Sequence, residues 1–206
     1  MGESIKRIVG PYQDSYSPNG IIGEKDACGV GFVANVEGIE SNWILKQSLK
    51  GLNCMEHRGG CGGDSDSGDG AGILCSIPWG YLEEKINLKN NQEFNRGLGM
   101  IFMPNKKEKI ELCKSICDQE AEKLKVNKTS WRKVPVNNEI LGPLAKANAP
   151  FICQWILYID KKDHQDVERL LFQLRKRIEK KIRETFKNDV GDCEFYFASL
   201  SSQTVV

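Results

Sequence analysis

FICQWILYID, residues 151–160, is a run of ten residues with apolar side chains at both odd and even positions. Successive side chains of a strand point to opposite faces, so such a run is typical of a strand that is buried on both faces. We therefore predict that residues 151–160 form the central strand of a sheet. This strand decides the fold, because other elements have to cover both of its faces.

Helices suited to cover this sheet are predicted on either side of the strand in the sequence. Residues 163–186 place apolar side chains at helical spacing among charged ones, which predicts a long helix that packs by one face. Residues 106–126 carry a second apolar stripe, and we expect its Cys113 and Cys117 to be core cysteines rather than metal ligands, because free cysteine is commonly buried. Ser41 is a suitable N-cap for a third amphipathic helix.

Further strands are predicted where apolar residues alternate or run continuously, over residues 28–36, 71–78, 98–103, 194–200 and 204–206. We expect the last two of these to form a hairpin around the sequence SSQ. The polar stretch around Asn90 and the segment NKTSWRKVPVNNE, residues 127–139, are expected to be surface connections. Strands interleaved with helices that layer on sheets predict an α+β fold.

The composition fits one domain with a short arm. The chain has 206 residues, of which 40% are hydrophobic, and 29 basic and 28 acidic residues give a net charge of +1. This balance gives no reason to expect a nucleic-acid or membrane surface, and the apolar runs are too short to span a bilayer. Eight cysteines are too few for a disulfide scaffold of this length, so we expect free thiols in a reducing compartment. Residues 1–27 lack the apolar region of a secretory signal and are expected to form a poorly structured arm.

A glycine-rich loop, HRGGCGGDSDSGDGAG at residues 57–72, has seven glycines among sixteen residues and therefore special backbone needs. Counted as a calcium loop from Asp64, its twelfth position is Cys75 instead of the required Glu, and it lacks the ending of a phosphate-binding loop. A purely structural turn remains open. His57 gives weak support for a Cys–His–Asn hydrolase, because the other histidine, His164, lies on a charged helix.

The segment DACGVGF, residues 26–32, places Cys28 ahead of a predicted strand, and Gly29 and Gly31 leave the space beside its thiol open. A thiol needs a base to act as a nucleophile near neutral pH. If residues 1–27 are removed, the freed α-amino group, with a pKa of about 7.7–8.0, is a suitable base. The alternative is that Cys28 is a small buried residue at the start of a strand.

Four segments in order, DACGVGF, MEHRGGCGGDSDSGDGAGILCSIPW, WRKVPV and LGPLAKANAP, closely resemble the amino-terminal part of the glutamate synthase large chain. The resemblance covers residues 28–206 and implies a class II glutamine amidotransferase domain with the N-terminal-nucleophile hydrolase fold, a four-layer αββα sandwich. Residues 1–27 match the propeptide that this family removes. The apolar end TVV and the resemblance lead us to expect a fragment in which the sandwich is incomplete and the isolated chain is inactive.

The resemblance implies that glutamine is hydrolysed to glutamate and ammonia through a Cys28 thioester. The ammonia then serves the reductive synthesis of glutamate from 2-oxoglutarate, which makes the full-length protein an oxidoreductase. The oxyanion hole and the residues that clasp the substrate are expected beyond residue 206. The site residues carried over from the family are the nucleophile Cys28, the substrate-binding Arg58 and Gly59, and the active-site loop residues Asp66, Asp69 and Gly70.

The resemblance also implies the cofactors, the partners and the location of the protein. No cofactor and no metal is expected in this segment, and FMN and an iron–sulfur cluster are expected in later domains. The expected partners are glutamine, the remaining domains, and ferredoxin or a nicotinamide-dependent small subunit as electron source, with no nucleic acid and no membrane. The expected location is the cytoplasm, or the plastid stroma in an alga or plant. Two alternatives stay open: another class II amidotransferase, and an inactive module for redox, metal-binding or interaction roles.

Overall fold

The computed structural model describes residues 29–55, 70–86, 94–126, 128–160, 163–187 and 195–206, and it consists of helices and two antiparallel sheets. The α+β class is confirmed. The larger sheet has the strand order β3 (Lys128–Lys133), β4 (Phe151–Asp160), β2 (Phe94–Met103) and β5 (Tyr196–Ser201). The smaller sheet pairs β1 (Cys75–Ser76) with β6 (Thr204–Val205).

Strand β4 lies at the centre of the larger sheet, between β3 and β2, as its apolar sequence predicts. It pairs with β2 along its whole length, from Asp160 opposite Phe94 to Phe151 opposite Met103. Trp155 is fully buried in the cluster on one face of the sheet, and Ile156 is fully buried in the cluster on the other. Both faces of the strand are therefore covered.

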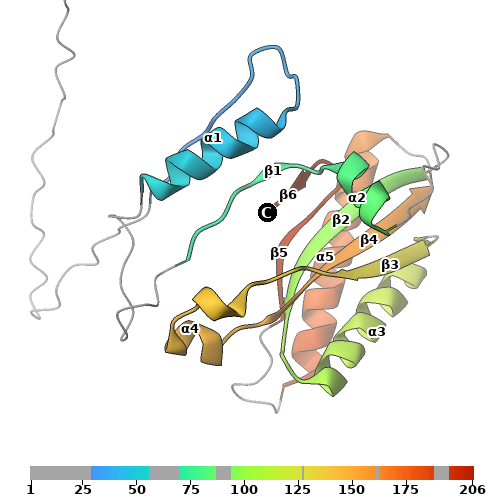
Figure 1. Cartoon of the computed structure of the whole chain (residues 1–206). Helices are drawn as coiled ribbons and strands as arrows, with labels where there is room; N and C mark the ends of the chain where they lie inside the picture. Colours follow the sequence, from blue (N-terminus) through green and yellow to red (C-terminus); the bar gives the residue numbers. More distant parts are fainter. Residues whose placement is uncertain (1–28, 56–69, 87–93, 127, 161–162, 188–194) are drawn as a thin grey trace, which may run out of the picture.

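Two helices, α3 (Lys107–Lys123) and α5 (His164–Thr185), pack on one face of the larger sheet (Figure 1). An ion pair also joins them, because Glu120 of α3 accepts a hydrogen bond from Arg177 of α5 at 2.8 Å. Hydrogen bonds from Lys123 and from Arg177 hold the pKa of Glu120 below its usual range. The predicted apolar stripe of α5 is confirmed, and its buried members are Val167, Leu171, Leu174, Ile178 and Ile182.

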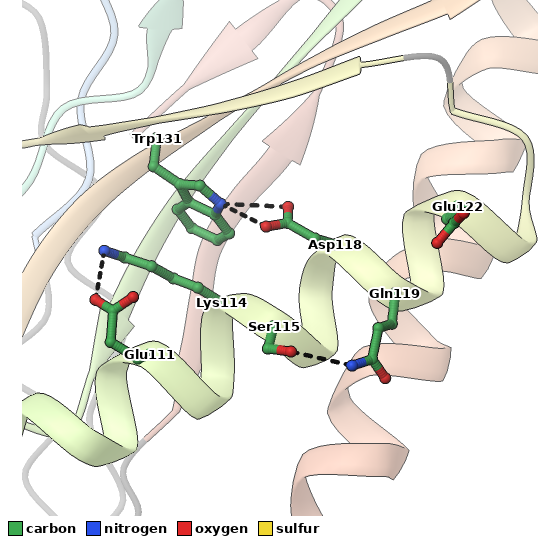
Figure 2. A pocket seen from close by; sticks show the side chains of 7 residues that line it. All are labelled: Glu111, Lys114, Ser115, Asp118, Gln119, Glu122 and Trp131. Carbon is green, nitrogen blue, oxygen red and sulfur yellow. Dashed lines mark hydrogen bonds and ion pairs between the residues drawn. The ribbon is translucent and has the colours of Figure 1, made fainter.

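The carboxylate of Asp118 joins α3 to β3 and β4. Its Oδ1 accepts hydrogen bonds from Nε1 of Trp155 at 3.1 Å, from Nε1 of Trp131 at 3.2 Å and from Oγ1 of Thr129 at 2.8 Å. Figure 2 shows the Trp131 side of this arrangement. The two indole rings are stacked with 5.3 Å between their centroids. Since an unpaired buried indole N–H costs free energy, this carboxylate fixes where α3 sits on the sheet.

The other face of the larger sheet is covered by the smaller sheet and by α2 (Trp79–Ile86). Leu82 of α2 and Val205 of β6 are buried there in one cluster with Leu98 and Ile156 of the larger sheet. The described layers therefore run from helices to a four-stranded sheet to a two-stranded sheet, in the order expected for part of an αββα sandwich.

Helix α1 (Asn42–Asn53) begins where the sequence predicts, because Oγ of Ser41 accepts a hydrogen bond from the backbone N–H of Ile44 at 3.4 Å. None of its residues is buried, and Trp43 is 63% exposed. Figure 1 shows α1 beyond β1, away from the larger sheet. In this chain α1 does not pack as a closed fourth layer.

Two of the predicted strand arrangements are wrong. Residues 29–36 form no strand, and Val30 and Phe32 are 97% and 94% exposed. Alternating apolar residues become a strand only where a partner accepts their backbone hydrogen bonds, and no described strand pairs with them. The expected terminal hairpin is also absent, because β5 pairs with β2 whereas β6 pairs with β1. The turn at residues 202–203 carries the chain from one sheet to the other.

Other segments differ from the sequence prediction in extent or in type. The expected surface connection over residues 127–139 contains the edge strand β3, which is held to α3 through Asp118. The strand predicted over residues 71–78 shortens to β1. Helix α2, the short helix α4 (Pro143–Ala147) and a 3-10 turn at Asn138–Ile140 were not predicted. No helix in the described ranges is long and apolar enough to cross a membrane.

The cysteines Cys113, Cys117 and Cys153 are buried, which confirms the core role predicted for the first two. Burial raises the pKa of the Cys117 thiol well above its usual value, and the neighbouring Cys113 and Asp118 add to this effect. Burial also raises the pKa of Cys153 to about 12, although nearby Lys114 opposes the shift. Because the thiolate is the reactive form, these thiols should be inert in the folded chain.

Replacement of Asp118 by alanine tests the junction between α3 and the sheet. We expect Asp118→Ala to lower the free energy of unfolding by about 1–3 kcal/mol, because the buried indole N–H of Trp155 loses its acceptor. Urea unfolding followed by tryptophan fluorescence measures the change. The control Glu122→Ala, at an exposed position of the same helix, should change stability by less than about 0.5 kcal/mol. Equal effects of the two substitutions would contradict the assigned role.

Alkylation with iodoacetamide at mildly alkaline pH tests the buried thiols. We expect the exposed Cys54 to be modified quickly in the native chain, and Cys113, Cys117 and Cys153 to be modified only after unfolding in denaturant. Mass spectrometry of the digested peptides identifies each modified site. Rapid modification of Cys117 or Cys153 under native conditions would show that the core is not closed as described.

Candidate functional site

Most residues predicted for the active site lie outside the described residues. These are Cys28, Arg58, Gly59, Asp66 and Asp69, so their positions stay predictions. Of the predicted site residues, Gly70 is described. The described segments nearest to these residues in the chain are residues 29–55, which follow Cys28, and residues 70–86, which follow the glycine-rich loop.

Gly70 opens the described segment that leads into β1. Its φ of +84° lies in the left-handed region, which costs free energy for residues with a side chain. A Cβ atom added at Gly70 would meet no heavy atom within 4 Å, so the backbone conformation rather than space favours glycine there. The special backbone expected of the glycine-rich loop is present at this described end.

The smaller sheet holds this segment in place. Cys75 and Ser76 of β1 pair with Val205 and Thr204 of β6. Just beyond the pairing, the backbone N–H of Ile77 donates to the carbonyl of Gln203 at 2.9 Å. A Cβ atom added at Gly72 would lie 3.7 Å from Cγ1 of Val206, so the backbone before β1 runs beside the chain that follows β6.

The thiol of Cys75 in β1 is partly buried. Burial raises the pKa of the Cys75 thiol, and the negative charge of Glu40 raises it further. The described backbone pairing of β1 is with β6. That the chain after Cys28 lies beside this segment stays a prediction.

A second candidate is a groove between α3 and β3, which the sequence analysis missed because it treated residues 127–139 as a connection (Figure 2). Its volume is about 480 Å³. Its polar groups bond to one another: Lys114 lies 3.2 Å from Glu111, and Gln119 donates to Ser115 at 3.0 Å. The lining residues are Glu111, Lys114, Ser115, Asp118, Gln119, Glu122 and Trp131. These pairings indicate a structural junction, and we assign no chemistry to the groove.

The spacing of Cys113 and Cys117 raises the question of a metal site. Within the ranges that the structure describes, no group of three or more His, Cys, Asp or Glu side chains is arranged to hold a metal ion. Cys113 and Cys117 lie instead in the apolar cluster between the helices and the larger sheet.

Comparison with known proteins gives one family match and a consistent set of relatives. Residues 28–206 match the family described as "Glutamine amidotransferases class-II". The chain is 40% identical over 190 residues to "Ferredoxin-dependent glutamate synthase 1, chloroplastic/mitochondrial" of Arabidopsis thaliana, which covers 90% of this chain and 12% of that protein. It is 38% identical over 190 residues to "Ferredoxin-dependent glutamate synthase 2" of Synechocystis, again covering 90% of this chain and 12% of the relative.

The match to another relative extends over the whole chain. "Ferredoxin-dependent glutamate synthase" of Pyropia yezoensis is 37% identical over 209 residues, which is 100% of this chain and 13% of that protein. The chain thus spans about an eighth of the length of the relatives that it matches.

The left-handed backbone at Gly70 predicts that alanine lowers the free energy of unfolding there but not at Gly80, a helical glycine. We expect Gly70→Ala to lower the free energy of unfolding by about 1 kcal/mol, because alanine disfavours a φ of +84°. Gly80, on helix α2, also has open space around it, so Gly80→Ala should leave stability unchanged or raise it by at most about 1 kcal/mol. Urea unfolding of both variants measures these changes. A Gly70→Ala variant as stable as the unmodified chain would contradict the role assigned to the left-handed backbone.

Proposed function

The chain belongs to the class II glutamine amidotransferases, and we propose that it forms the amino-terminal part of the glutaminase of a glutamate synthase. One observation carries this proposal: the family match begins at residue 28, the cysteine that the sequence singles out as a nucleophile. Identities of 37–40% to glutamate synthases of Arabidopsis thaliana, Pyropia yezoensis and Synechocystis support this assignment over other class II amidotransferases.

In the proposed reaction, the Cys28 thiolate attacks the side-chain amide carbon of glutamine. The α-amino group of Cys28, freed by removal of residues 1–27, takes the thiol proton and passes it to the departing ammonia. Water then hydrolyses the γ-glutamyl thioester and releases glutamate. An amine with a pKa of about 7.7–8.0 is well matched to this role near neutral pH. Hydrogen-bond donors aimed at the oxyanion lower the barrier to the attack.

The glycine-rich loop and its neighbours are proposed to serve the same site. A guanidinium group at Arg58 beside the thiol would favour the thiolate, and Gly59 would let the backbone turn at that point. Asp66, Asp69 and Gly70 are proposed to line the same pocket. Support comes from Gly70, whose φ of +84° is the left-handed backbone expected of a glycine-rich active-site loop.

The activity of the whole protein is a wider proposal, since the chain spans about an eighth of its relatives. We propose that the ammonia is used in the reductive synthesis of glutamate from 2-oxoglutarate, with FMN and an iron–sulfur cluster in other parts of the protein. The names of the relatives support ferredoxin as electron donor, and the name of the Arabidopsis relative, which reads chloroplastic/mitochondrial, supports a plastid location. The cytoplasm is the proposed location outside plants and algae. Oxyanion and substrate-clasping groups are proposed to follow residue 206, so the isolated chain should lack glutaminase activity.

The test replaces Cys28 by alanine in the whole natural polypeptide. We expect Cys28→Ala to abolish ammonia release from glutamine, because no thioester can form, and to preserve glutamate synthesis from free ammonia. Cys54→Ala removes an exposed thiol outside the proposed site and serves as the matched control, with both activities retained. Amino-terminal sequencing of active protein should start at Cys28. Glutamine-dependent activity in Cys28→Ala, or full activity in protein that still begins at Met1, would overturn the mechanism.

A further inference from the structure

Helix α5 holds the turn between β5 and β6 through the carboxylate of Glu168 and, more weakly, through Nε2 of His164, which lies 3.4 Å from the hydroxyl of Ser202. Oε1 of Glu168 accepts hydrogen bonds from the backbone N–H of Ser202 at 2.7 Å, from the hydroxyl of Ser202 at 2.6 Å and from the hydroxyl of Ser201 at 3.2 Å. Other acidic residues of α5, such as Glu179 and Glu184, instead lie beside basic side chains of the same helix. Unlike these two residues, Glu168 therefore bonds to a segment outside its own helix.

This turn is the point where the chain leaves the larger sheet. β5 is the edge strand of that sheet, and β6 pairs only with β1 among the described strands. The hydroxyl of Ser201 stabilises the crossing by accepting from the backbone N–H groups of Gln203 at 3.0 Å and Thr204 at 3.3 Å. Glu168 in turn accepts from Ser201, so the carboxylate sets the position at which β6 begins.

The smaller sheet depends on such an anchor. It has two strands of two residues each, and an isolated pair of strands is marginal without further support. Val205 adds support by packing in the apolar cluster on the larger sheet. Beyond the pairing, Ile77 donates to Gln203, and Gly72 runs beside Val206. A shift of the turn would therefore move β1 and the backbone from Gly70 to Gly72.

From this connected set of contacts we infer that Glu168 is a positioning residue of the glutaminase site. It acts through the turn at Ser201 and Ser202, through β6 and through β1 on the end of the active-site loop at Gly70. The inference rests on the proposed function for the identity of the site. It goes beyond that function because Glu168 lies on the helix that covers the opposite face of the larger sheet (Figure 1).

The experiment compares Glu168→Ala, Glu168→Gln and the control Glu184→Gln in the whole natural polypeptide. Glu184 is exposed, pairs with Lys180 at 4.0 Å and lies sixteen residues further along α5 than Glu168. We expect Glu168→Ala to lower kcat/KM for glutamine by about ten- to a hundredfold, since small displacements of a site have effects of this size. Glutamate synthesis from free ammonia should be unchanged. Glu168→Gln keeps an acceptor oxygen at the same place and should recover much of the lost activity.

Hydrogen exchange measured by mass spectrometry gives a second readout that does not depend on activity. In Glu168→Ala, exchange should accelerate in the peptide over residues 70–78, which contains the amide of Ile77, and stay unchanged in the peptide over residues 151–160. If Glu168→Ala does not fold, the same two peptides are compared in Glu168→Gln, where a smaller acceleration confined to residues 70–78 is expected.

The outcomes distinguish a failure of the proposed function from a failure of the positioning role of Glu168. If the wild-type protein releases no ammonia from glutamine, the proposed function is overturned. Hydrogen exchange of residues 70–78 would still show whether Glu168 anchors that segment. Unchanged exchange of residues 70–78 in a folded Glu168 variant would overturn the positioning role, as would an unchanged kcat/KM in Glu168→Ala. Equal losses in Glu168→Ala and Glu184→Gln would overturn it as well.

Discussion

Burial of both faces of β4 is the constraint on which the rest of the structure depends. Trp155 and Leu157 face the helices, and Ile156 faces the smaller sheet, and all three are fully buried. Because water is excluded from both sides, the strand needs partners along both edges and cover above and below. β2 and β3 supply the edges, α3 and α5 cover one face, and α2 with the smaller sheet covers the other.

Polar contacts set the positions that apolar packing leaves open. A hydrophobic face lets a helix slide or turn with little change in buried area, whereas a hydrogen bond has a fixed geometry. The carboxylate of Asp118 fixes α3 through indole and hydroxyl donors on the two neighbouring strands. The carboxylate of Glu168 does the same for the turn that leads into β6. In both places a single acidic side chain on a helix determines where a strand or turn lies.

The two faces of the larger sheet have different relations to function. The face under α3 and α5 carries the apolar core and the buried thiols, whose high pKa values suit a structural role. The other face carries the smaller sheet, whose strand β1 follows the glycine-rich loop in the chain. The turn between β5 and β6 connects α5 to strand β6 of the smaller sheet, through hydrogen bonds of Ser201 and Ser202 to Glu168.

The sequence by itself determined the elements that are marked by a local apolar pattern or by a capping residue. The central strand, the stripe of α5, the core position of Cys113 and the cap at Ser41 follow from local periodicity and capping chemistry, which depend on nearby residues alone. Its motifs also gave the family and the candidate site, of which the structure describes Gly70 with the left-handed backbone that a glycine-rich loop needs. The tertiary structure alone decided that residues 128–133 form an edge strand, that β6 leaves β5 for β1, and that residues 29–36 stay unpaired. These outcomes depend on which distant backbone groups are available for pairing, and local sequence patterns carry no information about that.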